Sequence, residues 1–357
     1  MPYYFNLPVI TDLTPDQQMA VDETRPLALS GGPGTGKSVV CLWRHIRNHA
    51  TGTSNSLLLT YTKTLEHYLR QSANDELRKN EAYDNEINIP IDRIQSWLYR
   101  NPINYDEIII DEGQDIKKES FERFLPFSDK ISYGADERQS IFIKDEELRE
   151  LLEWLNTHQK FSNNVKIPLN RNFRNSREIL VFTRSVFPNF LIPQNTINSS
   201  RETGLKPIMK LNVGWEIESQ VEKIISIIRD FQSDTHNIAV LVPFAREVDA
   251  YFLAINEAVG DAIEVSKYQN EQDIFRGLAG VHVTTFKSAK GTEFDTVIIP
   301  FFDKYNWILA NGDRFESRVT ENDYYVAFTR AKTNLFLICR KGFPRIGDIT
   351  TVNIELK

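Results

Sequence analysis

Two short stretches of this sequence have the residue types and the spacing that phosphate chemistry requires. Residues 31–38 read GGPGTGKS and fit the pattern G-x-x-x-x-G-K-[ST]. Glycines let the backbone turn its N–H groups toward phosphate oxygens, Lys37 can reach the terminal phosphates, and Ser38 can hold Mg²⁺. About 75 residues later, Asp111 can bind the same metal and Glu112 can act as a general base toward water. Together the two stretches predict a site for ATP and Mg²⁺.

The elements expected around these stretches would bring them to one edge of a parallel sheet. The apolar run 27–29 predicts a strand before the loop, and residues 39–43 predict a helix after it, whose dipole favours phosphate. The three isoleucines at 108–110 predict a buried strand that ends at Asp111. The nucleotide-binding candidates in the loop are Gly31, Gly32, Pro33, Gly34, Thr35, Gly36, Lys37 and Ser38.

Alternating strand and helix patterns continue along the chain and predict an α/β fold, with parallel sheets covered by helices on both faces. Thr14, Pro15 and Gln17 predict a capped helix before the loop strand. In the first half we also expect strands at 57–59 and 131–135, helices at 62–70, 91–100 and 146–158, and an irregular stretch at 74–90. In the second half we expect strands at 165–169, 207–211, 238–242, 281–285, 296–300 and 334–339, and helices at 215–231, 245–258 and 320–332.

The chain length predicts two domains of ordinary size, because 357 residues exceed what one hydrophobic core usually supports. Asn163 and Asn164 interrupt the pattern, and a new α/β series begins after them. We therefore expect one domain at 1–164, which holds the phosphate loop, and a second at 165–357, which has no such loop.

Composition indicates a globular protein with apolar cores, since 41% of the residues are hydrophobic and 25% are charged. The net charge of −7 provides no general attraction to nucleic acid, so any such binding must come from a local groove. The two cysteines, Cys41 and Cys339, lie in apolar runs, which is typical of small core residues in a reducing compartment. No signal peptide or membrane span is evident, and we expect a cytoplasmic protein without a membrane partner.

Several further stretches follow one another in a recognisable order. They are residues 13–21, 59–63, 134–140, 170–174, 284–295 and 325–332. With the loop and the D-E-x-Q-D pattern at 111–115, they make the sequence resemble the superfamily 1 helicases of the UvrD/Rep type over nearly its whole length. The runs SAKGTEF at 288–294 and YVAFTRA at 325–331 carry much of this resemblance. It implies two RecA-like P-loop NTPase domains, termed 1A (1–164) and 2A (165–357).

The resemblance also implies roles for single residues. Gln17 would read the adenine, Phe173 would stack on it, and Gly291 with Glu293 would meet the ribose and the hinge. The implied catalytic set is Glu112, Lys37, Gln139 as γ-phosphate sensor, Arg174 as a γ-phosphate arginine and Arg330 as the arginine finger of the second domain, with ATP bridging the two domains. On the residues alone, Gln139 fits a solvated turn equally well, and Arg330 could be an ordinary arginine on the surface of a helix.

The sequence departs from the family's pattern in the parts that contact nucleic acid. Little chain separates residues 93–97 from Asp111, which leaves no room for the family's first inserted domain, 1B, and we expect the second, 2B, to be absent too. The tryptophan usual after the Gln139 stretch is missing, Val39 replaces an arginine beside the adenine, and Lys287 replaces a histidine. The remaining candidates for contacts with single-stranded nucleic acid are Thr60, Tyr61, Thr62, Gln95, Trp97, Phe142, Lys144 and Lys287.

Two functions of different classes follow from these features. The first is an ATP-hydrolysing motor, a DNA-dependent ATPase and 3′-to-5′ single-strand translocase with weak or partner-dependent unwinding. The second is an ATP-dependent regulatory or scaffold subunit that licenses a partner protein such as a nuclease; the missing insertions and the negative net charge favour it. A P-loop kinase fits poorly, because the arginine and D-E-x-Q-D stretches would have no role in it. DNA is preferred to RNA as the nucleic acid, and RNA stays open.

Overall fold

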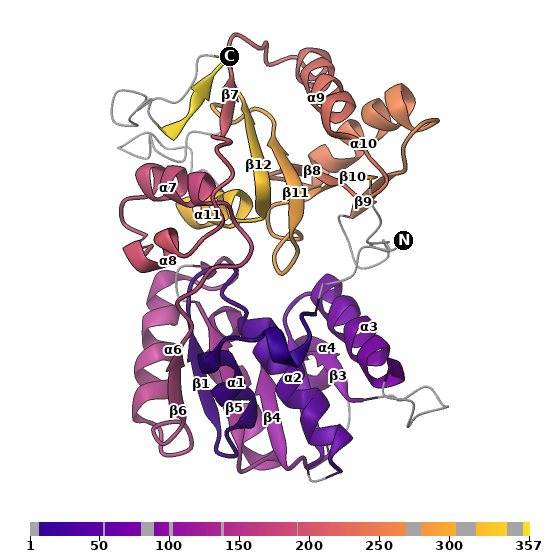
Figure 1. Cartoon of the computed structure of the whole chain (residues 1–357). Helices are drawn as coiled ribbons and strands as arrows, with labels where there is room; N and C mark the ends of the chain where they lie inside the picture. The colour runs from indigo at the N-terminus through magenta and orange to yellow at the C-terminus, as the bar shows by residue number, and fades with distance from the viewer. Residues whose placement is uncertain are drawn as a thin grey trace. The chain divides into compact units, whose positions relative to one another are not determined.

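The computed structural model describes residues 7–52, 54–79, 89–99, 103–136, 139–190, 192–268, 280–304, 319–340 and 353–357. The chain divides into two compact units, Tyr4–Arg171 and Asn172–Lys357, which we call the N-terminal and C-terminal units. Each is built on one parallel β-sheet with α-helices (Figure 1). The predicted α/β fold class is therefore confirmed.

The N-terminal unit has a six-stranded sheet in the order β3-β2-β4-β5-β1-β6. Its strands are β1 (Leu27–Ser30), β2 (Ser56–Thr60), β3 (Ile91–Arg93), β4 (Glu107–Ile110), β5 (Ile131–Ala135) and β6 (Val165–Pro168). Its helices are α1 (Pro15–Asp22), α2 (Lys37–Ala50), α3 (Lys63–Lys79), α4 (Ile94–Leu98), α5 (Lys118–Phe124) and α6 (Asp145–Thr157), with short 3₁₀ turns η1 (Ile10–Asp12), η2 (Gly113–Asp115) and η3 (Leu125–Phe127). The strand that precedes the loop, β1, lies between β5 and β6.

Successive residues of β4 pack on opposite faces of this sheet, as a strand with a period of two requires. Ile109 belongs to the core that α2 and α3 cover, whereas Ile108 and Ile110 belong to the core beneath α5 and α6. Both faces are thus buried by helices, which explains why the strand is a continuous apolar run. Burial of both faces fixes the position of the strand end that carries Asp111.

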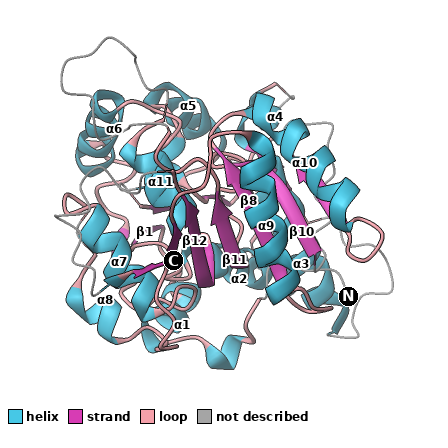
Figure 2. Ribbon diagram, turned by 90° about the horizontal axis from the view of Figure 1, so that it is seen from above, coloured by secondary structure: helices cyan, strands magenta, loops and turns pink. Residues whose placement is uncertain are grey.

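The C-terminal unit has a seven-stranded sheet in the order β13-β7-β12-β11-β8-β10-β9. Its strands are β7 (Ile208–Lys210), β8 (Asn237–Val242), β9 (Val265–Tyr268), β10 (Gly280–Thr285), β11 (Phe294–Ile299), β12 (Ala331–Ile338) and β13 (Glu355–Leu356). Its helices are α7 (Arg177–Val186), α8 (Gln194–Asn198), α9 (Ile217–Phe231), α10 (Ala245–Val259) and α11 (Glu321–Phe328). Helices α9 and α10 share a core with β8 and β10, beside which Figure 2 shows them. Helices α7 and α11 contact each other through the stacked rings of Phe182 and Phe328.

The structure divides the chain later than the expected boundary after residue 164. Strand β6 pairs with β1 from Leu27–Val165 to Ser30–Pro168, so the chain stays in the first sheet through Pro168. The division falls between Arg171 and Asn172 instead. Asn163 and Asn164 mark only a turn before β6. The Asn164 side chain donates to the carbonyls of Leu27 and Ile131 and so ties this turn to the same sheet.

Three expected elements have different limits in the structure. The helix expected at 91–100 is two elements, β3 and α4, because Ile91 and Asp92 pair with β2; residue 100 lies outside the described residues. Helix α3 continues through residues 74–79, which were expected to be irregular, and 80–88 lie outside the described residues. The helix expected at 320–332 ends at Phe328, since Ala331 already pairs with Phe294 of β11.

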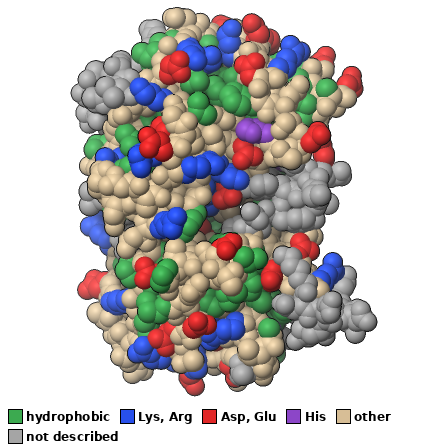
Figure 3. Space-filling view, viewed as in Figure 1, with side chains coloured by type: hydrophobic (Ala, Val, Ile, Leu, Met, Phe, Trp, Pro, Cys, Tyr) green, Lys and Arg blue, Asp and Glu red, His purple; other side chains and the backbone are tan. Residues whose placement is uncertain are grey.

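On the face that Figure 3 shows, charges of both signs lie side by side among the described residues. Figure 3 shows acidic and basic side chains interspersed over the visible face, in keeping with the modest net charge of −7. Among the helices of the described residues, none is both long enough and apolar enough to cross a membrane.

Candidate nucleotide site

The loop between β1 and α2 bends as its glycines predict. Gly34 and Gly36 have left-handed backbones, with φ of 68° and 87°, and Gly36 forms the N-cap of α2. A Cβ atom on Gly36 would collide with the Nε2 atom of Gln17, and one on Gly31 would lie 2.5 Å from the carbonyl oxygen of Leu169. Any residue with a side chain would therefore collide with its surroundings at Gly31 and Gly36. By contrast, a Cβ atom on Gly32 would meet nothing within 4 Å, so the loop is open there.

Lys37 holds its charged end inside the loop. Its Nζ atom donates to the carbonyl oxygens of Gly31 at 2.8 Å and Gly32 at 3.1 Å. Only 7% of the residue is exposed. The ammonium group therefore lies where the loop backbone curls, and phosphate oxygens that entered the loop would compete with these two carbonyls for its protons.

Lys37 and Asp111 come together across β5, which lies between the strands that precede them. A Cβ atom built on Gly134 of β5 would lie 3.5 Å from the Cβ atom of Lys37 and 3.7 Å from the Oδ1 atom of Asp111. Glycine at this position leaves room for the base of the Lys37 side chain and the Asp111 carboxylate to lie on either side of the same point of β5. This convergence at one sheet edge is the arrangement predicted from the sequence.

Asp111 has the properties expected of a buried ligand for a hard cation. It is completely buried, and neither carboxylate oxygen has a hydrogen-bond partner of regular geometry among the described residues. Burial, together with the neighbouring charge of Glu112, raises the pKa of Asp111 to about 7, although Ser38 and Lys37 partly offset this rise. Carboxylate and hydroxyl oxygens are ligands that Mg²⁺ accepts, so Asp111 and Ser38 fit the metal.

Glu112 has an unusual backbone conformation for a residue with a side chain. Its φ of 59° lies in the left-handed region, which costs roughly 1 to 2 kcal/mol for such residues. Its carboxylate accepts a hydrogen bond of 2.5 Å from the Nε2 atom of Gln114. Strained backbones of this kind are often found at functional sites. The turn at Glu112 redirects the chain from β4 into η2.

Gln17 links α1 to the loop instead of pointing into solvent. Its Oε1 atom accepts from the backbone N–H of Thr14 at 2.9 Å, which completes the predicted capping box. Its Nε2 atom donates to the carbonyl oxygen of Thr35 at 3.1 Å. Both ends of the carboxamide are thus engaged within the N-terminal unit, and the residue is 4% exposed.

Gln139 is a buried residue of the same unit, not a solvated turn. It is 3% exposed, and its Nε2 atom donates to the Oδ2 atom of Asp136 at 2.8 Å. Three residues further on, the ring of Phe142 lies 4.3 Å from the ring of Tyr61, centroid to centroid, at an angle of 30°. The two aromatic candidates therefore form a pair that joins the segment after β2 to the segment after β5.

The other nucleic-acid candidates differ in exposure. Gln95, Lys144 and Lys287 are exposed, and the hydroxyl of Thr62 accepts from the N–H of Leu65 at the start of α3. The prediction for Trp97 needs correction, because it is a core residue: it is 4% exposed and its ring lies 5.3 Å from that of Phe124. Thr60 is likewise completely buried. Neither side chain is available to a polynucleotide in this structure.

In the C-terminal unit, Arg174 and Glu293 are neighbours. The Nε atom of Arg174 lies 3.0 Å from the Oε2 atom of Glu293, and Lys332 approaches the other oxygen of this carboxylate at 3.7 Å. Phe173, next in the chain to Arg174, is 52% exposed. The structure thus brings Arg174, the candidate for the γ-phosphate, next to Glu293, a candidate for the ribose, and the exposed ring of Phe173 belongs to the neighbouring residue in the chain.

Arg330 is buried in the C-terminal unit, which rules out the alternative of an ordinary surface arginine. It is 1% exposed, and its guanidinium donates to the carbonyl oxygens of Val326 at 3.0 Å and Thr292 at 3.2 Å. Gly291, the neighbour of Thr292, has a left-handed backbone with φ of 84°. Arg330 therefore holds the segment before β11 against the end of α11.

Gln114 and Lys332 lie among these candidate residues, although the sequence alone indicates no role for either. Gln114 contacts Glu112, and Lys332 contacts Glu293. Both belong to stretches that carried the resemblance, the D-E-x-Q-D pattern and the stretch at 325–332 that contains Arg330. The usable signal was therefore their place inside a motif, not their residue type.

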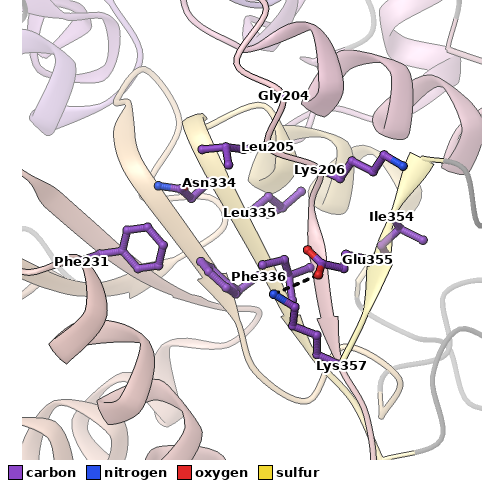
Figure 4. A pocket seen from close by; sticks show the side chains of 11 residues that line it. Gly204, Leu205, Lys206, Phe231, Asn334, Leu335, Phe336, Ile354, Glu355 and Lys357 are labelled. Carbon is purple, nitrogen blue, oxygen red and sulfur yellow. Dashed lines mark ion pairs between the residues drawn. The ribbon is translucent and has the colours of Figure 1, made fainter.

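A cavity of about 440 Å³ lies elsewhere in the C-terminal unit. Figure 4 shows the side chains that line it, which come in part from the neighbouring strands β12, β7 and β13; two of them, Glu355 and Lys357, form an ion pair of 3.0 Å. None of the residues predicted for the nucleotide site or for nucleic-acid contacts lines it. The lining residues are Gly204, Leu205, Lys206, Ile208, Phe231, Asn334, Leu335, Phe336, Ile354, Glu355 and Lys357.

Comparison with known protein families gives one match in the C-terminal unit. Residues 255–342 match the model of the UvrD-like helicase C-terminal domain. This range contains both runs that carried the resemblance, SAKGTEF and YVAFTRA. No curated protein matches the sequence.

Similar solved structures include helicases with low sequence identity to this chain. The C-terminal domain of a possible DNA helicase from Lactobacillus plantarum WCFS1 has 20% identity and a TM-score of 0.39, over 52% of this chain and 98% of that domain. An arterivirus nonstructural protein 10 helicase in complex with DNA has 12% identity and a TM-score of 0.46, over 94% of this chain. The PRRSV helicase has 12% identity and a TM-score of 0.41, over 91% of this chain.

The chain spans 64% and 54% of the lengths of these two viral helicases. The family match instead covers the segment 255–342. This segment contains Glu293 and Arg330, for which the resemblance implies nucleotide contacts. The resemblance to the UvrD/Rep-type helicases of superfamily 1 is confirmed, and the family evidence for it lies in residues 255–342, which match the UvrD-like helicase C-terminal domain.

Proposed function

We propose that this protein is an ATP-hydrolysing motor that moves along single-stranded nucleic acid, with DNA preferred to RNA. The observation that carries the proposal is the convergence of Lys37 and Asp111 on Gly134, with Glu112 next in the chain. An ammonium group, a completely buried carboxylate and a second carboxylate at one sheet edge suit hydrolysis of a nucleoside triphosphate. The family of residues 255–342 supports a helicase-like motor over other ATPases.

In the proposed reaction, a water oxygen forms a bond to the γ-phosphorus of ATP while the bond from this phosphorus to the bridging oxygen breaks. Glu112 accepts one proton from the water, and the electron pair of the broken bond stays on ADP. Lys37 neutralises charge on the phosphate oxygens. The products are ADP and phosphate, and Glu112 returns its proton to solvent.

Ser38 and Asp111 would hold Mg²⁺ during this reaction. When bound, the metal neutralises charge on the β- and γ-phosphates. Asp111 supports this assignment because it is completely buried and its two carboxylate oxygens lack regular partners in the described part of the chain. For Gln17, Phe173, Gly291 and Glu293 we propose contacts with the nucleoside, and for Gln139, Arg174 and Arg330 contacts that sense or neutralise the γ-phosphate.

Contacts with nucleic acid are proposed for the exposed and half-buried candidates. Tyr61 and Phe142 form an aromatic pair, and stacking of a base on such a ring contributes roughly 1 to 3 kcal/mol. Lys144 and Lys287 are exposed and can bind phosphates of the backbone. The proposed direction of movement is 3′ to 5′, and unwinding is proposed to be weak or to need a partner.

The variant Glu112→Gln tests the catalytic assignment. It should bind a fluorescent ATP analogue with an affinity close to that of the wild type and lose at least about 100-fold in kcat, because the amide cannot accept the water proton. Glu119→Gln is a matched control, since Glu119 is an exposed carboxylate on α5. Normal turnover by Glu112→Gln would remove Glu112 from the role of general base.

A further inference from the structure

Gln114 is completely buried beside Glu112, and its side chain bridges two segments of the N-terminal unit. Its Nε2 atom donates to the carboxylate of Glu112 at 2.5 Å, and its Oε1 atom accepts from the backbone N–H of Asp136 at 2.9 Å. We propose that Gln114 is a positioning residue that transmits the state of the segment after β5 to the Glu112 carboxylate. This inference rests on the proposed function, in which Glu112 is the general base.

The orientation of the Gln114 carboxamide follows from its two neighbours. A carboxylate accepts hydrogen bonds and a backbone N–H donates them, so the NH₂ group must face Glu112 and the oxygen must face Asp136. The reversed orientation would put an oxygen against the carboxylate and N–H groups against an N–H. Glutamine is suited to this bridge because it donates at one end and accepts at the other without a net charge.

Further hydrogen bonds tie the same two segments together. The hydroxyl of Ser140 donates to the backbone carbonyl of Gln114 at 3.2 Å, and the N–H of Ile141 donates to the Oδ1 atom of Asp115 at 3.1 Å. Gln139 donates to the side chain of Asp136 at 2.8 Å. Asp136 is thus hydrogen-bonded to Gln114 at the start of this segment, and Ser140 and Ile141 are hydrogen-bonded to Gln114 and Asp115 at its end.

This segment leads directly into the aromatic pair. Phe142 follows Ile141 in the chain, and its ring lies 4.3 Å from that of Tyr61. A base that displaced either ring would move the segment to which Gln114 is bonded. Because buried hydrogen bonds are costly to leave unmade, the Gln114 amide would follow Asp136 and carry the Glu112 carboxylate with it.

Glu112 is well placed to respond to such a movement. Its left-handed backbone, with φ of 59°, lies at the turn between β4 and η2, outside the regular hydrogen bonding of the strand. Its carboxylate accepts a hydrogen bond from Gln114, so a shift of Gln114 bears directly on the direction of the carboxylate. A misplacement of about 1 Å at a reacting group can lower a rate by about 100-fold, so a small shift transmitted by Gln114 is enough to control hydrolysis.

The test compares Gln114→Met with Gln220→Met in steady-state ATP hydrolysis, with and without an oligo(dT) single strand. Methionine keeps the length and burial of glutamine and removes both hydrogen bonds. Gln220 is a matched control: it is also completely buried, it donates to the carbonyl of Gly214 at 2.7 Å and accepts from the N–H of Phe301 at 2.9 Å, and it lies in the C-terminal unit. Thermal unfolding reports the loss of stability in both variants.

We expect Gln114→Met to lose at least about tenfold in kcat with DNA while its KM for ATP changes less than about twofold, so that the stimulation by DNA disappears. Gln220→Met should keep the stimulation of ATP hydrolysis by DNA, even if its unfolding temperature falls by as much as that of Gln114→Met. If Gln114→Met does not fold, Gln114→Asn, which keeps the amide but is too short to bridge both partners, should show the same loss.

Stimulation of Gln114→Met, or of Gln114→Asn, to the wild-type extent would overturn this inference and leave the proposed function intact. A wild-type protein that hydrolyses no ATP in either condition would instead overturn the proposed function, and the role of Gln114 with it. The two failures are distinguishable because only the second is seen in the wild type.

Discussion

Asp111, the proposed Mg²⁺ ligand, has an environment that disfavours its charged form. Its carboxylate is completely buried, and its oxygens lack regular hydrogen-bond partners among the described residues. A buried charge that is poorly paired destabilises the native state, and here burial and the charge of Glu112 raise the pKa of Asp111 to about 7. Functional sites often retain such costs because the same group is needed for activity.

We therefore expect Asp111→Asn to raise stability and abolish activity. At pH 8, with chelator present, the neutral amide should raise the free energy of unfolding by roughly 1 to 3 kcal/mol. Turnover with Mg²⁺ should fall to background, since the amide is a poor metal ligand. Urea unfolding and an ATPase assay check the two effects, and a less stable variant would contradict the cost assigned to the buried carboxylate.

Lys37 offers a second test at the same scale. Its ammonium donates to the carbonyls of Gly31 and Gly32, and Lys37→Met removes the charge while it keeps most of the side chain. We expect binding of an ATP analogue, measured by fluorescence titration, to weaken at least about tenfold. An unchanged affinity would show that the phosphates do not approach the loop.

The placement of candidate residues could be anticipated from the sequence only where a motif fixes it. Lys37, Asp111 and Glu112 fall into this class, and their convergence follows from parallel strands that share an edge. Trp97 does not: its apolar spacing suits a core helix as well as a nucleic-acid contact, and only the rings of Phe124 and Phe127 around it settle the matter. The bridge made by Gln114 depends on Asp136, 22 residues away, and no local pattern indicates such a contact.

At the scale of elements, α2 runs from the loop, at the carboxyl ends of the strands of the first sheet, toward the amino ends of these strands. Arg44 of α2 forms an ion pair of 2.8 Å with Glu107 at the start of β4, and both side chains are almost completely buried. Arg44 also donates to the backbone carbonyls of Glu23 and Arg25, before β1. One side chain thus fixes the helix, the loop strand and the strand that ends at Asp111.

Removal of this arginine should be costly. We expect Arg44→Met to lower the free energy of unfolding by roughly 3 to 5 kcal/mol, because Glu107 is left as a buried charge. The double variant Arg44→Met with Glu107→Gln should recover part of this loss, since the buried carboxylate is replaced by a neutral amide. Urea unfolding of both proteins checks the prediction, which fails if the double variant is no more stable than the single one.

His45, also on α2, makes stability depend on pH. It is completely buried, its Nδ1 atom lies 2.9 Å from the hydroxyl of Ser56, and burial lowers its pKa well below the usual value. Below about pH 6.5 the unfolded chain binds a proton at this residue that the folded chain does not, so stability falls as the pH falls. His45→Gln should flatten this decline between about pH 7 and 5 in urea unfolding, and an unchanged slope would contradict it.

Most strands and long helices of both units could be predicted from apolar spacing, because burial on both faces of a parallel sheet leaves a continuous apolar run. The errors occurred where pairing with a distant strand overrides local spacing. Residues 91–93 have a spacing that fits a helix, yet they pair with β2. Ala331 was expected to be helical, yet it is part of strand β12 because it pairs with β11. Strand β6 likewise joins the first sheet through its contact with β1, more than a hundred residues away.

At the scale of the whole molecule, the chain has two α/β units whose candidate residues differ in kind. The N-terminal unit contains the loop lysine, the two carboxylates and the aromatic pair, and the C-terminal unit contains Arg174, Glu293 and Arg330. Little chain remains outside the first core for an inserted domain, since residues 99–106 alone separate α4 from β4. We therefore expect motor activity without strong unwinding of duplex.

The most direct test of the central claim is the rate of ATP hydrolysis by the wild-type protein with Mg²⁺, measured with and without single-stranded DNA. We predict hydrolysis that needs Mg²⁺ and rises at least about tenfold with DNA, because we propose that a strand bound near the Tyr61–Phe142 pair acts on Glu112. A rate that DNA leaves unchanged, with no DNA retained on a filter in the presence of an ATP analogue, would contradict the motor and favour the regulatory subunit.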